Sequence, residues 1–392
     1  MVLGGGPIQT SKSINEAMLM VFERLALFFV IGLTMSCSVA NSSKSNRVSK
    51  SPNTTAAGAL QKVGVVPAGK SPIDIFCIDA KRCWLWDVTN LWQSLDGCQT
   101  WKLLYSTQRE DAPQKYEFFS ETNGWAITAS TLLRTADSGH LWLQQSSPFD
   151  GQGEIRTLVS LKGSEAVWLA GGIYRPQTSE ELRYGVPNNT KDVTGGKVLE
   201  EAIFRTDDGG KHWQRGVMRR SSIGRILGLR FSGRTHGIAI SERTIYYTSD
   251  AGNSWKPAEF NKGCVGKEFL IDTYEGQPTA VSMLDSGASL VSYSDGRLVK
   301  SQDAGHSWCD LLRPGAVKFE EIGSQYFTAI QFTDSEHGWA LGFDKYLYQT
   351  GDGGVSWTRL SSATRFESLF FPGHDYGLLL SRDEVFRLPP QN

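Results

Sequence analysis

An eight-residue pattern recurs six times in this chain, and it constrains the fold more than any other feature. The pattern is Ser or Thr, any residue, Asp, any residue, Gly, two further residues and Trp. We call each copy a box. Repeats at regular intervals are typical of repeat architectures. The boxes begin at Ser94, Thr135, Thr206, Thr248, Ser301 and Thr350, and the Ser94 box has Cys98 where the others have glycine.

Each box predicts a turn that closes a β-hairpin. The segments before the boxes are strand-like, as in Ala202–Thr206. An Asp in such a turn accepts backbone N–H groups, a Gly supplies a positive φ, and a Trp has a large apolar face to bury. We therefore expect turn-forming rather than catalytic carboxylates at Asp96, Asp137, Asp208, Asp250, Asp303 and Asp352.

A second repeated unit precedes the boxes and completes the structural repeat. It consists of an apolar strand, a polar turn and a Gly-aromatic start to the next strand, as in FTDSEHGWAL at Phe332–Leu341. With the strands on either side of the box, each repeat has four strands, which is the composition of a propeller blade. The sequence predicts an all-β fold, a seven-bladed β-propeller with four-stranded antiparallel blades.

Two departures from the regular repeat locate an insertion and the ring closure. The 71-residue interval between the Thr135 and Thr206 boxes predicts one blade with an insertion at Tyr174–Glu200. After Trp357 only three strands remain, so the last blade lacks its outer strand. We expect Leu60–Val66 to supply that strand, because pairing of the two chain ends removes free sheet edges.

The chain before the propeller has two parts, and we divide the protein accordingly. An apolar run at Leu25–Met35 is short for a membrane span and typical of a secretory signal. Residues 1–40 are then a signal peptide cleaved after Ala40, or a lipoprotein signal with lipidation at Cys37; an uncleaved membrane anchor is the alternative. Residues 41–59, rich in Ser, Asn and Thr, predict a disordered linker, and residues 60–392 form the propeller.

The remaining cysteines and the charge balance limit the chemistry. Cys83 and Cys98 both replace glycines at turns on the same face of the first blade, so we predict a disulfide between them, compatible with export. The pairing of Cys77, Cys264 and Cys309 stays open. The His and Cys spacing does not suggest zinc, and we expect no metal or cofactor. A net charge of −1 argues against nucleic-acid binding.

Arginines gather where the predicted topology leaves long loops. The insertion and the connections between blades lie on the face opposite the boxes, and such loops commonly carry binding sites. A basic patch there would suit carboxylates or phosphates of a partner, although Glu180, Glu181 and Glu242 are near in sequence. We predict partner contacts at Arg175, Arg183, Arg219, Arg220, Arg225 and Arg243.

The box resembles the Asp-box, or BNR, repeat of β-propellers. Combined with the F-x-x-x-x-x-G-W-A pattern, most clearly in Phe332–Trp357, it resembles the photosystem II assembly/stability factor family over residues 60–390. That resemblance implies an exported, non-enzymatic seven-bladed propeller that binds a protein partner, such as a membrane-protein complex. It implies a periplasmic protein or a membrane-anchored lipoprotein, or a thylakoid-lumen location in a photosynthetic cell. We expect a monomer that contacts the membrane only through a lipid anchor.

Two other function classes share this architecture. Sialidases and xyloglucanases also carry Asp-boxes, but the nearest match to a sialidase arginine motif is Tyr174-Arg175-Pro176, which lacks the Ile and lies mid-chain. The chain also lacks a convincing pair of catalytic carboxylates. A carbohydrate or cell-surface binding module would need exposed aromatic side chains on the face opposite the boxes. The candidates are Trp86, Trp92, Tyr174 and Tyr184.

Overall fold

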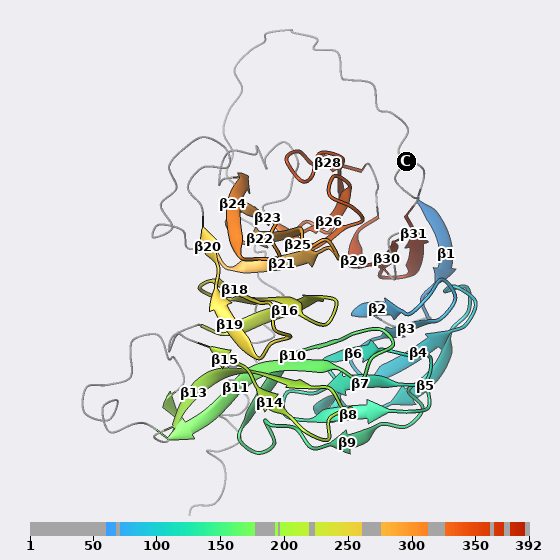
Figure 1. Cartoon of the computed structure of the whole chain (residues 1–392). Coiled ribbons are helices and arrows are strands. Elements are labelled where there is room, and N and C mark those ends of the chain that lie inside the picture. The colour runs from blue at the N-terminus through green and yellow to red at the C-terminus, as the bar shows by residue number, and fades with distance from the viewer. Residues whose placement is uncertain are drawn as a thin grey trace, which may run out of the picture. The chain divides into compact units, whose positions relative to one another are not determined.

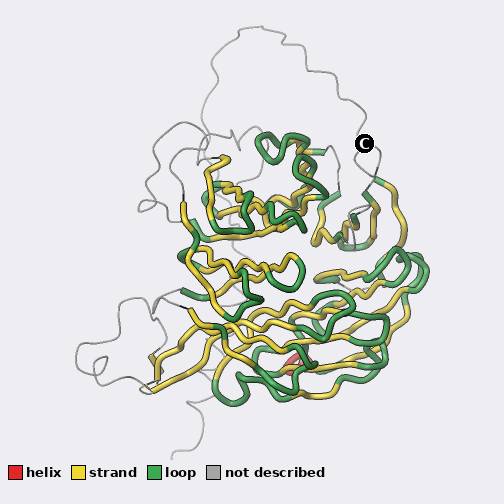
Figure 2. Tube along the Cα trace, viewed as in Figure 1, coloured by secondary structure: helices red, strands yellow, loops and turns green. Residues whose placement is uncertain are grey.

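A computed structural model describes most of the region after the first 59 residues. The described residues are 60–67, 71–176, 193–194, 197–218, 224–260, 276–312, 326–360, 364–371 and 377–388. The chain divides into units at residues 1–55 and 56–392, and every described residue belongs to the second unit. The 3₁₀ turn Arg109–Asp111 is the one helical segment there (Figure 2). Nothing helical in this part of the chain is long and apolar enough to cross a membrane.

Seven sheets follow one another along the chain, and the consecutive strands within each are antiparallel (Figure 1). Each meanders from an innermost to an outermost strand, with successive strands paired as neighbours. Blade one has β2 (Asp74–Cys77), β3 (Cys83–Trp86), β4 (Asn90–Ser94) and β5 (Lys102–Ser106). Blade two has β6 (Lys115–Phe118), β7 (Gly124–Ile127), β8 (Leu132–Thr135) and β9 (Leu143–Gln145).

Blades three to five are larger because each carries a fifth strand. Blade three has β10 (Gly153–Ser160), β11 (Val167–Pro176), β13 (Lys197–Thr206) and β14 (Gln214–Arg215), with β12 (Val193–Thr194) beside β13. Blade four has β16 (Ile226–Ser232), β17 (His236–Ser241), β18 (Ile245–Thr248) and β19 (Ser254–Pro257). Blade five has β21 (Pro278–Met283), β22 (Ser289–Tyr293), β23 (Leu298–Ser301) and β24 (Ser307–Leu312).

Two of the extra strands tie neighbouring blades together. The chain leaving blade three forms β15 (Val217–Met218), which pairs in parallel with β19 of blade four. The chain leaving blade four forms β20 (Glu259–Phe260), which pairs in parallel with β24 of blade five. The outer edges of blades four and five are thereby covered by chain from the preceding blade.

The last two sheets close the ring. Blade six has β25 (Phe327–Phe332), β26 (Gly338–Gly342), β27 (Leu347–Thr350) and β28 (Thr358–Arg359). Blade seven has β29 (Phe366–Phe370), β30 (Leu378–Ser381) and β31 (Glu384–Arg387), and β1 (Gln61–Val65) pairs with β31 as its outermost strand. The innermost strands contact one another in succession, and β29 contacts β2. The predicted seven-bladed propeller, closed by an N-terminal strand, is confirmed.

The boxes form the turns between the third and fourth strands, and all six share one hydrogen-bond pattern. In the Thr248 box, the Thr248 hydroxyl accepts the Gly252 N–H at 2.9 Å and donates to Asp250 at 2.8 Å. The Asp250 carboxylate also accepts the Ser254 N–H at 2.9 Å. These bonds satisfy the backbone groups that the tight turn exposes.

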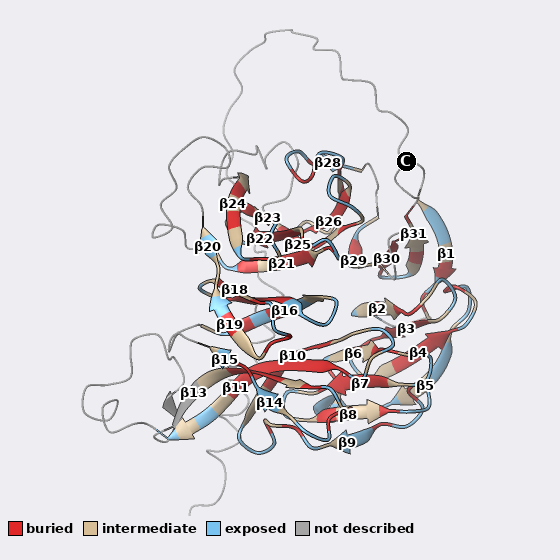
Figure 3. Ribbon diagram, in the orientation of Figure 1, coloured by how far each residue is buried: buried red, intermediate tan, exposed pale blue. Residues whose placement is uncertain are grey.

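The hydrophobic core lies between blades rather than within one of them. The buried residues form seven clusters, one at each junction of neighbouring blades, so both faces of every sheet are packed (Figure 3). Tryptophans of the Gly-aromatic turns extend across two of these junctions. Trp84 donates to the Ser138 carbonyl in the next box at 2.9 Å, and Trp168 donates to the Ala251 carbonyl at 2.8 Å. The indole N–H groups of these two tryptophans are thereby satisfied by a neighbouring blade.

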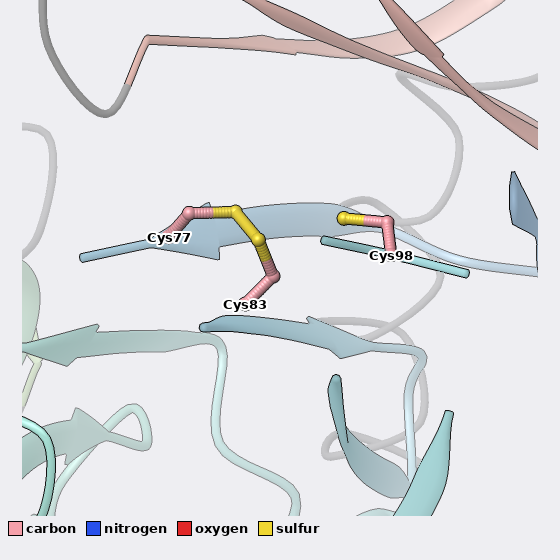
Figure 4. A group of neighbouring side chains, drawn as sticks. All are labelled: Cys77, Cys83 and Cys98. Carbon is pink, nitrogen blue, oxygen red and sulfur yellow. A yellow bond between two sulfur atoms is a disulfide. The ribbon is translucent and has the colours of Figure 1, made fainter. Parts of the chain in front are cut away.

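The disulfide predicted between Cys83 and Cys98 is wrong. Cys83 is bonded to Cys77, and Cys98 is a free, buried thiol (Figure 4). The reason is strand register: Cys77 and Cys83 lie directly opposite each other in the β2–β3 pair, with Cα atoms 4.1 Å apart. Opposite residues of antiparallel strands come closer than residues on two separate turns. Cys309 is also disulfide-bonded.

Candidate partner-binding site

Blades three and four present most of the described arginines that the sequence pointed to. The end of β11, the start of β16 and the β17–β18 turn lie on the face opposite the boxes, which we call the loop face. This arrangement follows from the meander, since connections between second and third strands and between blades all fall on one side. Arg175 ends β11, Arg225 precedes β16, and Arg243 lies in the β17–β18 turn. Arg183, Arg219 and Arg220 lie outside the described residues.

The arginines at the end of blade three share one carboxylate. Arg175 Nε donates to Glu200 Oε2 at 2.9 Å, and Arg215 Nη2 approaches Glu200 Oε1 at 2.5 Å. Both guanidinium groups are partly exposed, as is the carboxylate between them. Partly exposed Arg–carboxylate pairs are held weakly enough to exchange partners. Glu200 therefore orients two cations at the surface without removing them from solvent.

A second arginine–glutamate group lies on blade four. Arg225 Nε donates to Glu242 Oε1 at 2.9 Å, and the Arg225 backbone N–H donates to Glu242 Oε2 at 3.1 Å. Burial by itself would raise the pKa of Glu242, but the hydrogen bonds from Arg225 outweigh it, and the pKa is lowered. The stem of the exposed Arg243 lies against Gly224, which has a φ of +68°. A side chain at that glycine would displace Arg243.

A buried ion pair joins these two surface groups and was missed by sequence reasoning. Arg156 of β10 donates to both carboxylate oxygens of Glu201 at 2.5 Å and also contacts Glu154. Glu201 accepts the Ile226 N–H of blade four at 3.0 Å. The side chains are 17% and 7% exposed, respectively. The one available signal was charge alternation in Glu154–Arg156, which is unusual on an innermost strand of a propeller.

The described part of the loop face is therefore charge-patterned rather than uniformly basic. Arg175 and Arg215 share Glu200, and Arg225 pairs with Glu242. Glu242, noted in the sequence as an acidic neighbour, is a direct ion-pair partner. A ligand that contacts these arginines must compete with the two glutamates or join them, which favours an acidic group with several acceptor oxygens over an isolated anion.

The innermost strands bring further ionisable side chains toward the ring axis. Lys115 of β6 donates to the Leu158 carbonyl at 2.6 Å, and its Nζ lies 3.8 Å from Glu117. Asp74 of β2 accepts a hydrogen bond from Ser368 of β29. Burial raises the pKa of Asp74 and of Glu117 and lowers the pKa of Lys115. The Lys115 bond joins the innermost strands of blades two and three, and the Asp74 bond joins those of blades one and seven.

A cavity of about 140 Å³ opens beside this charged layer, at the end nearer the boxes. Aromatic rings of three blades line it, together with Cys77, Glu117 and Lys162. The Lys162 Nζ crosses from blade three to donate to the Ile78 carbonyl at 2.7 Å. The cavity is small for a drug-sized ligand, so we do not place partner binding there.

The aromatic candidates for a glycan site differ from one another in exposure. Trp86 and Trp92 are only 2% and 5% exposed because both faces of blade one pack against neighbours. Neither tryptophan therefore offers a ring to a glycan at the surface. Tyr174 is 36% exposed near Arg175, and Tyr184 lies outside the described residues. One exposed ring does not form the aromatic platform that a glycan site would need.

Comparison with known proteins places these features in context. No protein-family model matches the chain. The photosystem II assembly lipoprotein Ycf48 of Picosynechococcus sp. is 24% identical over 289 residues, covering 67% of this chain and 79% of that protein. Ycf48 of Thermosynechococcus vestitus is 24% identical over 289 residues, covering 68% and 78%. This chain is similar to the photosystem II assembly factors.

Solved structures agree with that similarity at the level of the fold. The structure described as YCF48 bound to D1 peptide has a TM-score of 0.57 at 20% identity and covers 83% of this chain and 96% of that chain. YCF48 from Cyanidioschyzon merolae has a TM-score of 0.59 at 16% identity, covering 86% and 100%. A GH74 xyloglucanase from Xanthomonas campestris shares the fold at a TM-score of 0.53, but this chain spans 53% of it. The resemblance to photosystem II assembly factors, predicted from the repeated motifs, is confirmed.

Proposed function

We propose that this protein is an exported, non-enzymatic scaffold that assists assembly of photosystem II by binding a segment of the D1 protein. The sequence similarity to Ycf48 over 289 residues carries this proposal. A relative with the same fold has been solved with a D1 peptide. Because fold alone does not specify function, the support rests on sequence similarity combined with the surface described above.

The loop face of blades three and four is the proposed docking surface. Glu200 orients Arg175 and Arg215, and Glu242 orients Arg225, so the rotamers of these three arginines are biased before a partner binds. A preorganised guanidinium loses less entropy on binding a carboxylate than a free one. Acidic side chains or a terminal carboxylate of a peptide would complete the second hydrogen-bonding edge of these arginines. Arg183, Arg219 and Arg220 are assigned to the same surface by their sequence position.

Export is supported by the cysteine chemistry of the propeller. Cys77 and Cys83 form a disulfide, and Cys309 is disulfide-bonded as well. Such bonds persist in oxidising compartments and are rare in reducing ones. We assign residues 1–40 to the export signal, with Cys37 as the lipidation site or Ala40 as the last residue removed. The proposed location is therefore periplasmic or membrane-anchored through a lipid, or the thylakoid lumen in a photosynthetic cell.

Peptide binding tests the proposal directly. Overlapping fluorescent peptides that tile the D1 protein are titrated with the protein, and anisotropy is measured at two salt concentrations. We expect one peptide to bind, and we expect Arg243→Glu and the double change Arg219→Glu/Arg220→Glu each to weaken it about tenfold or more. Binding should also weaken with salt, because the contacts are charged and exposed.

Arg234→Glu is the matched control. Arg234 is an exposed arginine in the β16–β17 turn of blade four, on the box face. It should leave both peptide binding and the thermal midpoint nearly unchanged. If no D1 peptide binds, the assembly-factor proposal fails and glycan binding is tested next. If a peptide binds equally to all variants, D1 recognition stands and the loop-face assignment is wrong.

A further inference from the structure

Three cysteine side chains meet at the junction of blades seven and one. Cys77 ends β2, Cys83 begins β3, and Cys98 lies in the box that follows β4. The three sulfur atoms all lie within 4.8 Å of one another, and Figure 4 shows the Cys98 sulfur directed toward the Cys77–Cys83 disulfide. All three residues are buried, at 2% exposure or less. A free thiol is therefore held against a disulfide in a buried site.

The backbone around Cys98 sets this cysteine apart from a chance substitution at the surface. In the five other boxes the equivalent residue is glycine, with φ between +87° and +98°. Cys98 has a φ of +74°, a region that side chains other than glycine occupy at a cost. The box nevertheless keeps its geometry, with the Cys98 N–H donating to Ser94 Oγ at 2.8 Å. The turn thus holds the third sulfur in place against an intrinsic backbone preference.

We propose that Cys77, Cys83 and Cys98 form a thiol–disulfide exchange centre that delivers a reactive thiol to the axial cavity. The Cys98 thiolate attacks the Cys83 sulfur, a Cys98–Cys83 bond forms, the Cys77–Cys83 bond breaks, and Cys77 leaves as a thiolate. The proton lost by Cys98 is balanced by the proton that Cys77 takes up. No oxidant or reductant is consumed. Cys77–Cys83 remains the resting pair, and the exchanged pair is a minor species.

The surroundings of Cys77 decide the direction of attack. Cys77 lines the cavity of about 140 Å³, where a leaving thiolate can meet solvent, whereas Cys83 does not line it. Lys162 lines the same cavity and binds the carbonyl of the adjacent Ile78, so a positive charge lies on the side of the leaving sulfur. Glu117 also lines the cavity, but burial raises its pKa and so favours its neutral form. A leaving group departs faster when its thiolate is stabilised.

Burial keeps the rate of thiol–disulfide exchange low at neutral pH. It raises the pKa of Cys98 to about 12, with Arg387 of β31 favouring the thiolate and Asp96 of the same box opposing it. Only the thiolate attacks a disulfide, so the exchange rate should rise about tenfold for each pH unit between pH 7.5 and pH 9.5. Any contact that draws Arg387 closer to Cys98 would accelerate exchange at constant pH.

The Cys77 thiol that exchange releases into the cavity would be a modification site for small thiol-reactive molecules. A low-molecular-weight disulfide that enters the cavity can react with the Cys77 thiolate, giving a mixed disulfide on Cys77 and releasing one thiolate. The Cys98 carbonyl also abuts Gly64 of the closing strand β1. Exchange at this centre therefore takes place at the contact that completes the ring.

The test traps the free thiol in the folded full-length protein. The protein is incubated with iodoacetamide from pH 7.5 to pH 9.5, then digested without reduction, and the labelled cysteine and the remaining disulfides are mapped by mass spectrometry. We expect label on Cys77 together with a Cys83–Cys98 linked peptide, formed about tenfold faster per pH unit. Cys98→Gly and Cys98→Ser should show no label on Cys77.

The two variants distinguish the proposal from simpler explanations. Cys98→Gly restores the residue present in the other boxes, so it should fold, and Cys98→Ser keeps a side chain of similar size. Label on Cys98 with the Cys77–Cys83 bond intact would overturn the proposal, because Cys98 would then be only a buried thiol that opening exposes. Label on Cys83, equal labelling of Cys77 in Cys98→Gly, or no label on any of the three cysteines would also overturn it.

Discussion

At the scale of single residues, the boxes show how one carboxylate organises a tight turn. Asp250 accepts the Ser254 N–H at 2.9 Å, the Ser254 hydroxyl at 2.6 Å and the Thr248 hydroxyl at 2.8 Å. Its function is comparable to that of a side chain that caps a helix, since it satisfies backbone donors that the turn cannot pair. The carboxylate is therefore engaged in holding the turn.

Replacing Asp250 with alanine should lower the free energy of unfolding by about 1 kcal/mol, the usual cost of losing such a hydrogen-bonding side chain. The reason is that the Ser254 N–H loses its acceptor while the turn stays in place. Thermal and urea denaturation measure the change. Ser249→Ala, at the neighbouring exposed box position, is the control and should have almost no effect; equal losses in both variants would contradict the assigned hydrogen bonds.

Prediction of single residues from the sequence succeeded for the repeated box pattern. It failed where a residue's partner depends on a contact that occurs only once in the fold. The box pattern predicted a hairpin turn with a buried Trp, because Gly and Trp are each required at one position in it. It could not predict the partner of Cys83, since both Cys77 and Cys98 were within reach and only the β2–β3 register chooses between them. The Arg156–Glu201 pair was equally hidden, because its members are far apart in sequence and meet only when blade three has folded.

At the scale of elements, the closing strand depends on a glycine. A side chain at Gly64 of β1 would overlap the Cys98 carbonyl oxygen, and the β1–β31 register shifts at this residue. Gly64→Ala should therefore destabilise the protein by about 1–3 kcal/mol, the typical cost of an overpacked contact. Differential scanning calorimetry measures the loss. Val65→Ala on the same strand, where the side chain is exposed, is expected to be nearly neutral.

Blades three and four are joined by the buried pair of Arg156 and Glu201. Arg156→Met should cost about 3–5 kcal/mol, because it leaves Glu201 buried without its cation. The double variant Arg156→Met/Glu201→Leu should recover most of that loss, since no charge then remains buried. Denaturant unfolding of the parent, Arg156→Met, Glu201→Leu and the double variant forms a double-mutant cycle. A double variant as unstable as the single one would mean that packing, not charge, holds this junction.

At the scale of the whole molecule, six equivalent carboxylates give the propeller a common response to acid. The Thr100 hydroxyl and N–H lower the pKa of Asp96 to about 2, and hydrogen bonds from His212 lower that of Asp208. Each group therefore contributes stability that is complete above pH 4 and is lost as the pH falls through the folded-state value. The thermal midpoint should fall steeply between pH 4 and pH 2.

The acid response has its own control. Asp96→Asn keeps the size of the side chain but does not titrate, so its midpoint should start lower at pH 6 and fall less between pH 4 and pH 2. Circular dichroism across this range measures both slopes. Parallel curves for the variant and the parent would show that the acid limb arises from other carboxylates.

The architecture as a whole was predictable because the repeats each indicate the same arrangement of strands in a blade. The number of blades, their order and the closing role of Leu60–Val66 follow from box spacing and from one missing strand, whereas the fifth strands of blades three to five, β12, β15 and β20, were not predicted. The contacts of the loop face were harder to predict from the sequence, because its residues differ from blade to blade. Arg175 and Arg225 were singled out by sequence, but only the structure shows that Glu200 and Glu242 hold them.

The pairing of β1 with β31 also decides when this protein can finish folding. Lys62 and Glu384 form an ion pair across 322 residues of sequence, so almost the whole chain must be synthesised before the seventh blade exists. Until then the inner face of blade one and the edge of β1 have no partner. Contacts between residues so far apart make the search slow. A nascent chain of this protein would need protection from aggregation until its last strands emerge.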